Sequence, residues 1–202
     1  MTKMQRWSIF GLAITALPLL GVVLFFTLTG PQDLSKFPPS ETSPYLLPWP
    51  DGGCCLCIQG VRGIVSHRGA SQFAYDFYMP IASDICAARA GKVVKVVQHH
   101  DGNGRKWPNN AIVIDHGDGT RAYYAHIKRA GASVSVGDIV EQRQVIAASG
   151  NVGNSMMPHL HFHITDGGRT VPISFQDVKK DRGVPRMFKM YTSGGSTAIT
   201  DR

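Results

Sequence analysis

Histidine and apolar residues alternate strictly between residues 158 and 163, in the stretch PHLHFH. In an extended strand successive side chains point to opposite faces, so His159, His161 and His163 share one face and the apolar side chains share the other. A row of imidazoles is costly to desolvate unless each ring has a partner such as a metal ion, a carboxylate or a backbone carbonyl. The pattern therefore indicates metal binding or catalysis, with satisfied structural histidines as the alternative.

Further short apolar runs follow from residue 54 onward, separated by turn signals of Gly, Asp and Asn. No segment after residue 30 shows a long 3.6-residue period, so strands are expected rather than helices. The fold class expected is mainly β, an antiparallel β-sheet domain over residues 51–175. Its strands are expected near residues 57–58, 74–78, 91–97, 111–115, 121–126, 138–140, 144–147 and 160–164.

The N-terminal run from Ile9 to Leu28 contains no charged residue and is about as long as a helix that crosses a bilayer. Lys3 and Arg6 precede it, so the positive-inside rule places the rest of the chain outside the cytoplasm. A cleaved signal peptide is the alternative, but the run is longer than a usual signal core and no Ala-x-Ala site follows it. We expect one transmembrane helix in residues 1–29 and a single-pass membrane protein whose domain faces the periplasm or cell wall.

Two other segments lack strand patterns. Residues 30–50 are rich in proline and polar residues, which is typical of an extended, weakly structured linker. Residues 176–202 show little periodicity and are expected to form a C-terminal tail that is disordered from Ser193 onward.

Net charge of +7 and a pI near 9.4 favour an anionic partner. The Lys and Arg residues are scattered and no basic patch is interleaved with aromatic residues, so nucleic acid is not the expected partner. A polyanionic cell envelope fits both the charge and the predicted export.

Four cysteines, at positions 54, 55, 57 and 86, would lie in an oxidising compartment, which favours disulfides. Neighbouring Cys54 and Cys55 are poorly placed to bond to each other, so the expected bridge joins Cys86 to one of the first three. A Cys-Cys-x-Cys metal site is a weaker alternative, because it lacks the paired Cys-x-x-Cys spacing of structural zinc sites.

A zinc hydrolase needs three protein ligands of His, Asp or Glu type and a fourth position open to water. Asp76 is a candidate, because an unpaired charge inside the apolar strand around it would be expensive. His67 lies shortly before that strand, and His126 ends another apolar strand. These side chains are expected to join the histidines of the 158–163 stretch.

Several motifs, in this order, resemble the lysostaphin/LytM-type zinc metallopeptidases, which cut peptides of bacterial peptidoglycan. The resemblance covers about residues 59–165 and implies an antiparallel β-sheet domain with an open groove. The motifs are Gly117-Asp118-Gly119-Thr120, Tyr124-Ala125-His126, Val136-Gly137-Asp138-Ile139-Val140, Ser149-Gly150-Asn151-Val152-Gly153 and Pro158-His159-Leu160-His161-Phe162.

The resemblance implies that Asp76 and His161 bind Zn²⁺, and that His126 and His159 are the catalytic pair. The commonest first motif of the family places a histidine four residues before the aspartate, where this chain has Gln72. A branch of the family resembles this chain in placing Ser-His-x-Gly ahead of the aspartate strand, which favours His67 as the third metal ligand. Gln72 as a ligand, or a damaged metal site, is the alternative.

His163 stands where this family often has an acidic residue, so it either orients a ligand or lies at the groove edge. The expected function is that of a membrane-anchored zinc metalloendopeptidase acting on peptidoglycan peptides. The alternative is a non-catalytic regulator of the same fold that activates other cell-wall hydrolases. A biotinyl- or lipoyl-type carrier is disfavoured, because no lysine occurs between residues 130 and 165.

Overall fold

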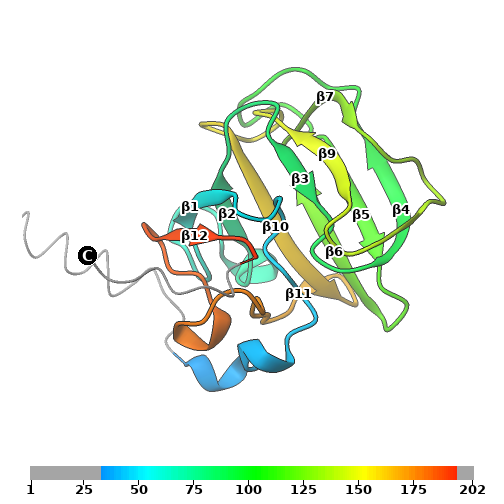
Figure 1. The fold of residues 1–202 in the computed structure, drawn as a ribbon. Coiled ribbons are helices and arrows are strands. Elements are labelled where there is room, and N and C mark those ends of the chain that lie inside the picture. The colour runs from blue at the N-terminus through cyan, green and yellow to red at the C-terminus, as the bar shows by residue number, and fades with distance from the viewer. Residues whose placement is uncertain (1–32, 195–202) are drawn as a thin grey trace, which may run out of the picture.

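The computed structural model describes residues 33–194, and their fold is mainly β, as the apolar pattern predicts (Figure 1). All pairings between the named strands are antiparallel. One sheet has the order β12-β1-β2-β10-β6-β5-β4-β8, with β11 beside β10, and a smaller sheet has the order β3-β9-β7. The strands are β1 (Cys54–Gln59), β2 (Tyr75–Tyr78), β3 (Asp84–Cys86), β4 (Gly91–Val97), β5 (Ala111–Asp115), β6 (Thr120–Ala125), β7 (Ile127–Ala132), β8 (Ile139–Val140), β9 (Val145–Ser149), β10 (His159–Asp166), β11 (Arg169–Thr170) and β12 (Met190–Thr192).

Short 3-10 helices supply the helical turns of residues 33–194. They are η1 (Leu34–Lys36), η2 (Ser40–Thr42), η3 (Gly69–Ser71) and η4 (Asp181–Gly183). Within the same residues no helix is long and apolar enough to cross a membrane. The predicted anchor, Ile9 to Leu28, lies outside the described residues.

Strand β10 runs through the middle of the larger sheet, between β2 and β6 (Figure 1). Leu160, Phe162 and Ile164 are fully buried, which confirms that the apolar side chains of this strand share the core face. The register sets His161 opposite Asp76 on β2. The histidine face of β10 therefore meets the acidic residue of its neighbour.

The core fills the space between the two sheets, because both turn apolar side chains inward. In Figure 1 β3 and β9 lie in front of β5 and β6. Ile112 and Ile114 of β5 belong to the same buried cluster as Ile85 and Ile146 of the smaller sheet. Burial of each such side chain is worth about 1.5–3 kcal/mol, so the packing fixes how β10 and its neighbours lie.

The segment predicted as a weakly structured linker packs on the domain instead. Leu47 and Trp49 are each 1% exposed, and the Trp49 ring meets Phe77 of β2 edge-on at 4.9 Å. The amide of Leu46 also donates to the carbonyl of Ala88. Composition pointed to a linker because prolines dominate the segment, whereas the few apolar residues between them decide its packing.

The predicted C-terminal tail is likewise ordered as far as the structure describes it. Strand β12 pairs with β1 and closes one edge of the larger sheet. The Asp177 carboxylate accepts hydrogen bonds from the amides of Leu47 and Gly194, at 3.1 and 3.3 Å. Ser193 is 1% exposed, so the prediction of disorder is wrong at this residue; positions from 195 onward lie outside the described residues.

The four cysteines are free, so the predicted disulfide is not formed. Cys54, Cys55 and Cys57 lie on β1 of the larger sheet, whereas Cys86 lies on β3 of the smaller one. Sequence spacing could not show that the two groups belong to different sheets.

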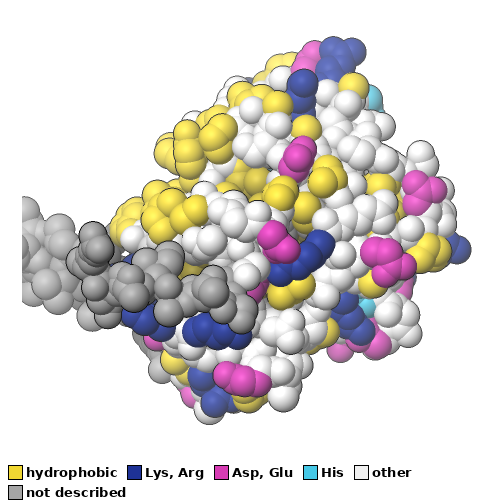
Figure 2. Space-filling view, viewed as in Figure 1, with side chains coloured by type: hydrophobic (Ala, Val, Ile, Leu, Met, Phe, Trp, Pro, Cys, Tyr) yellow, Lys and Arg dark blue, Asp and Glu magenta, His cyan; other side chains and the backbone are white. Residues whose placement is uncertain are grey.

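Basic and acidic side chains are interspersed on the face shown in Figure 2, and hydrophobic side chains gather toward one side of it. Several arginines are paired with carboxylates, among them Arg89 with Asp118 at 2.6 Å and Arg121 with Asp115 at 2.8 Å. Figure 2 shows no continuous basic patch on this face, and these ion pairs offset part of the net positive charge.

Candidate metal centre

Three side chains that are far apart in the sequence converge beside β10. His67 comes from the loop between β1 and β2, Asp76 from β2 and His161 from β10, and their ligand atoms all lie within 4.8 Å of one another. Asp76 Oδ1 lies 2.8 Å from His161 Nδ1, and Oδ2 lies 3.2 Å from His67 Nε2. The carboxylate thus stands between two imidazoles, as the sequence predicted for the metal ligands.

The buried environment of His67 fits a cation. Its Nδ1 lies 2.8 Å from the carbonyl of Gly60, to which it donates as N–H. In that tautomer Nε2 carries a lone pair, and this fully buried atom makes no hydrogen bond. An unpartnered nitrogen lone pair facing a carboxylate and a second imidazole is the mixed N and O donor set that Zn²⁺ accepts.

Asp76 is kept ionised in spite of its burial. Burial by itself would raise the pKa of Asp76, but the hydrogen bond from His161 and the electrostatic attraction of the His161 and His67 rings hold the pKa well below 3.8. The carboxylate therefore keeps its negative charge at neutral pH and is ready to bind a cation.

His126 and His159 lie next to the converging ligands, with their ring centroids 4.5 Å apart. The ring of His126 is 6.0 Å from that of His161, and His159 Nε2 is 3.7 Å from Asp76 Oδ1. The structure therefore brings together all five side chains that were predicted to form the site.

Backbone carbonyls orient the two histidines. The Nδ1–H of His126 donates to the Val152 carbonyl at 2.7 Å, and that of His159 donates to the Met157 carbonyl at 2.8 Å. These bonds leave both Nε2 atoms free to accept a proton. A Cβ on Gly150 would lie 2.8 Å from the His126 carbonyl oxygen, so only glycine lets the segment that carries Val152 approach so closely.

Both rings are neutral at pH 7. Burial lowers the pKa of His126 to about 4, and repulsion from His159 acts in the same direction. Burial likewise lowers the pKa of His159 below its ordinary value of 6.5. A neutral imidazole with a free Nε2 can act as a general base.

These lowered pKa values predict a loss of stability in acid. Below pH 6.5 the histidines of the unfolded chain take up protons, whereas His126 stays neutral in the fold until about pH 4. The free energy of unfolding of metal-free protein is therefore expected to fall as the pH drops from about 6.5 to about 4. In His126→Gln, denaturant titrations across this range should show a free energy of unfolding that depends less steeply on pH. An unchanged pH dependence would contradict the burial of a neutral imidazole.

His163 contacts a predicted ligand. Its Nδ1 lies 3.0 Å from His161 Nε2, and its ring stacks on Tyr123 with centroids 4.9 Å apart. If His161 uses Nδ1 for a metal, its Nε2–H is left to donate to His163. Of the two roles considered for His163, the contact favours that of orienting His161.

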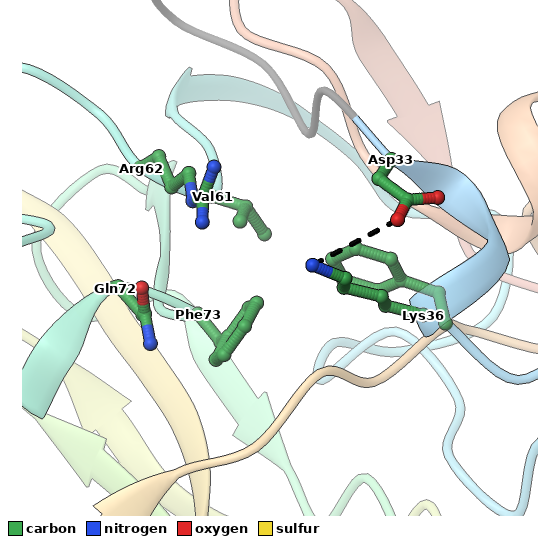
Figure 3. Close-up of a pocket in the computed structure, with 7 residues that line it drawn as sticks. Asp33, Lys36, Val61, Arg62, Gln72 and Phe73 are labelled. Atoms are coloured by element: carbon green, nitrogen blue, oxygen red, sulfur yellow. Dashed lines mark ion pairs between the residues drawn. The ribbon is translucent and has the colours of Figure 1, made fainter.

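Gln72, the alternative third ligand, belongs to a different pocket. Figure 3 shows its side chain with those of Arg62, Val61 and Phe73, around a pocket that Lys36 also lines. Its backbone carbonyl accepts a hydrogen bond from the Arg62 amide. His67 and not Gln72 is therefore the side chain that joins Asp76 and His161.

Two further polar residues at the site were not predicted from the sequence. Gln59 Nε2 donates to Asp76 Oδ2 at 2.8 Å. Ser155 Oγ lies 3.1 Å from His159 Nδ1 and donates to the Met157 carbonyl. Gln59 had a detectable signal, because it continues the buried alternation of Cys55 and Cys57 with a polar side chain.

A protein-family model and several known proteins match the part of the chain that contains most of these side chains. The model of peptidase family M23 matches residues 70–173, about half of the chain. Lysostaphin of Staphylococcus simulans is 36% identical over 96 residues, which are 47% of this chain and 18% of the relative. The glycyl-glycine endopeptidase ALE-1 of Staphylococcus capitis is 35% identical over 96 residues, which are 47% of this chain and 25% of the relative. The peptidoglycan DD-endopeptidase ShyA of Vibrio cholerae is 30% identical over 122 residues, which are 60% of this chain and 26% of the relative.

The matched part of the chain spans only about a fifth to a quarter of the length of these relatives. The family match nevertheless includes four of the five converging side chains, and only His67 precedes it. Because that match extends over half of the sequence, the chain belongs to peptidase family M23.

Proposed function

We propose that the chain is a zinc metalloendopeptidase that hydrolyses peptide bonds of peptidoglycan. The observation that carries the proposal is the convergence of His67, Asp76 and His161 on one point, beside two neutral histidines. Catalytic zinc sites combine three protein ligands with nearby groups that move protons.

In this proposal His67 Nε2, one Asp76 oxygen and His161 Nδ1 hold the metal. A zinc ion bound there would polarise the scissile carbonyl and make a water molecule more acidic. The free Nε2 atom of one of the two rings, His126 or His159, accepts the proton of the attacking water and later delivers it to the nitrogen that leaves when the C–N bond breaks. While protonated, that ring also donates a hydrogen bond to the developing oxyanion. The carbonyls of Val152 and Met157 keep both rings in the required tautomer.

The substrate class follows from the family and from the names of the relatives. One relative is named a glycyl-glycine endopeptidase and another a peptidoglycan DD-endopeptidase. Because the two names specify different bonds, we propose the class, peptide bonds of peptidoglycan, without choosing one bond. The net charge of +7 suits a polyanionic envelope, and we expect no nucleic-acid partner.

We further propose that residues 1–29 anchor the protein in the membrane, with the domain on the extracytoplasmic side. The support is the uncharged run from Ile9 to Leu28 after Lys3 and Arg6. Membrane fractionation tests this part: the chain should resist extraction by alkaline carbonate, and recovery in the soluble fraction would contradict an anchor.

Metal removal tests the enzymatic proposal. Purified peptidoglycan incubated with the protein should release soluble peptide fragments; chelation should abolish the release, and added Zn²⁺ should restore it. His116→Ala is a matched control, because His116 lies at the opposite end of β6 from His126 and bonds the Ala90 carbonyl. Fragment release that survives complete metal removal would contradict the proposal, and a chain that neither binds zinc nor releases fragments would point to the non-catalytic regulator.

A further inference from the structure

Gln59 connects Asp76 with the loop that carries His67. Its Nε2 donates to Asp76 Oδ2 and to Ser66 Oγ, each at 2.8 Å. Its Oε1 accepts hydrogen bonds from the amides of Val65 and Ser66, at 3.0 and 3.2 Å. Both N–H donors and both lone pairs of this carboxamide are therefore in use, at a side chain that is only 4% exposed.

The bond to Asp76 orients the carboxylate. Asp76 Oδ1 faces His161, whereas Oδ2 is shared between Gln59 and His67. A donor on Oδ2 limits rotation of the carboxylate and keeps both oxygens aimed at the two imidazoles. An amide is also uncharged, so it orients the carboxylate without offsetting the negative charge that a metal cation needs.

The bonds to Val65 and Ser66 hold the loop. His67 follows these residues directly, and Val65 is 70% exposed, so apolar packing contributes little at this point. Because their amides bond to Gln59, the same side chain that orients Asp76 also fixes the backbone just before His67.

Gly63 leaves the room in which the Gln59 side chain lies. A Cβ at position 63 would come within 2.1 Å of Gln59 Cγ and 2.8 Å of Gln59 Oε1. Gly63 is not among the residues with positive φ, so the glycine is required by space rather than by backbone conformation. A methyl group there would force the carboxamide away from its four partners.

We infer that Gln59 is a positioning residue of the metal centre, which holds Asp76 and the His67 loop in a geometry that binds zinc. The inference rests on the proposed function, because it assigns Gln59 a role toward the same metal. Groups that orient metal ligands from outside the ligand set typically contribute 10- to 100-fold to metal affinity.

Zinc affinity of the full chain, measured at pH 7 by competition with a chromogenic chelator, tests the inference. Gln59→Ala is expected to weaken zinc binding about 10- to 100-fold. Gln142→Ala is the matched control, because the Gln142 carboxamide likewise connects two segments of the chain, donating to the carbonyls of Pro44 and Ala88 away from the site. Gln142→Ala should keep the zinc affinity of the unsubstituted chain. Urea titration of both metal-free variants measures their loss of folding stability, and the difference in zinc affinity should remain even if that loss is similar.

A double-mutant cycle with Gly63→Ala separates positioning from a general loss of structure. Gly63→Ala should weaken zinc binding in the same way, because it displaces Gln59 without removing it. Combined with Gln59→Ala it should add nothing, since the displaced side chain is already gone. Unchanged zinc affinity in Gln59→Ala, or losses that multiply in the double variant, would overturn the inference. If the unsubstituted chain binds no zinc, the proposed function fails instead.

Discussion

Replacing His161 with alanine is expected to abolish fragment release from peptidoglycan and to weaken zinc binding by about 10³-fold. Protein zinc sites bind the metal with roughly 10–16 kcal/mol, and if each of three ligands contributes about a third, the loss of one ligand weakens binding by about 10³-fold. His161 Nδ1 lies 2.8 Å from Asp76 Oδ1, so its loss also leaves a buried carboxylate with one imidazole fewer. Zinc competition and a peptidoglycan release assay on the same preparation measure both effects.

His116→Ala serves again as the control, because it removes an imidazole that bonds the Ala90 carbonyl outside the site. It should retain both zinc binding and fragment release. A His161→Ala variant that still hydrolyses peptidoglycan would rule out the metal centre described above.

The second large effect is expected at His126, where replacement by alanine should lower the hydrolysis rate about 10²- to 10⁴-fold while zinc affinity stays unchanged. His126 lies outside the group of three ligand atoms, but its ring is 6.0 Å from that of His161. Because it is expected to move a proton and not to bind the metal, rate and affinity should separate.

His159→Ala is expected to behave in the same way, since its Nδ1 is also bonded to a carbonyl and its Nε2 faces the site. Equal losses of zinc affinity and hydrolysis in either variant would show that the residue is a ligand and not a member of the proton-transfer pair.

Local pattern was sufficient to predict the central strand and most of the site. The alternation from His159 to His163 predicts a half-buried strand, and β10 has that form. Asp76 was singled out because it is an acidic residue in an apolar strand, where a buried charge needs a partner. The structure supplies two imidazoles as its partners. In both cases a single segment carried the physical reason for the prediction.

Features that depend on contacts between distant segments were missed or predicted wrongly. Proline content suggested a linker, but Trp49 packs on Phe77, a contact that composition cannot show. Strand β12 forms by pairing with β1, and the tail itself has no alternating pattern to announce it. The two carbonyls that orient His126 and His159 are backbone atoms, so no side-chain motif marks them.

The third metal ligand could be predicted from the sequence only in part. The sequence favoured His67 by resemblance and kept Gln72 as the alternative, because distance along the chain does not determine which side chain reaches Asp76. The loop between β1 and β2 turns His67 inward, where it is fully buried, and places Gln72 against Arg62. The alternation along β1 could have marked Gln59 as buried, but its role in holding that loop became clear only from its four hydrogen bonds.

Anomalous diffraction at the zinc absorption edge, from crystals of the zinc-loaded protein, tests the metal centre most directly. One strong peak is expected at about 2.0–2.2 Å from His67 Nε2, an Asp76 oxygen and His161 Nδ1, with His126 and His159 close by but outside bonding distance. A peak bound by other residues, or no peak at these three side chains under saturating zinc, would contradict the assignment.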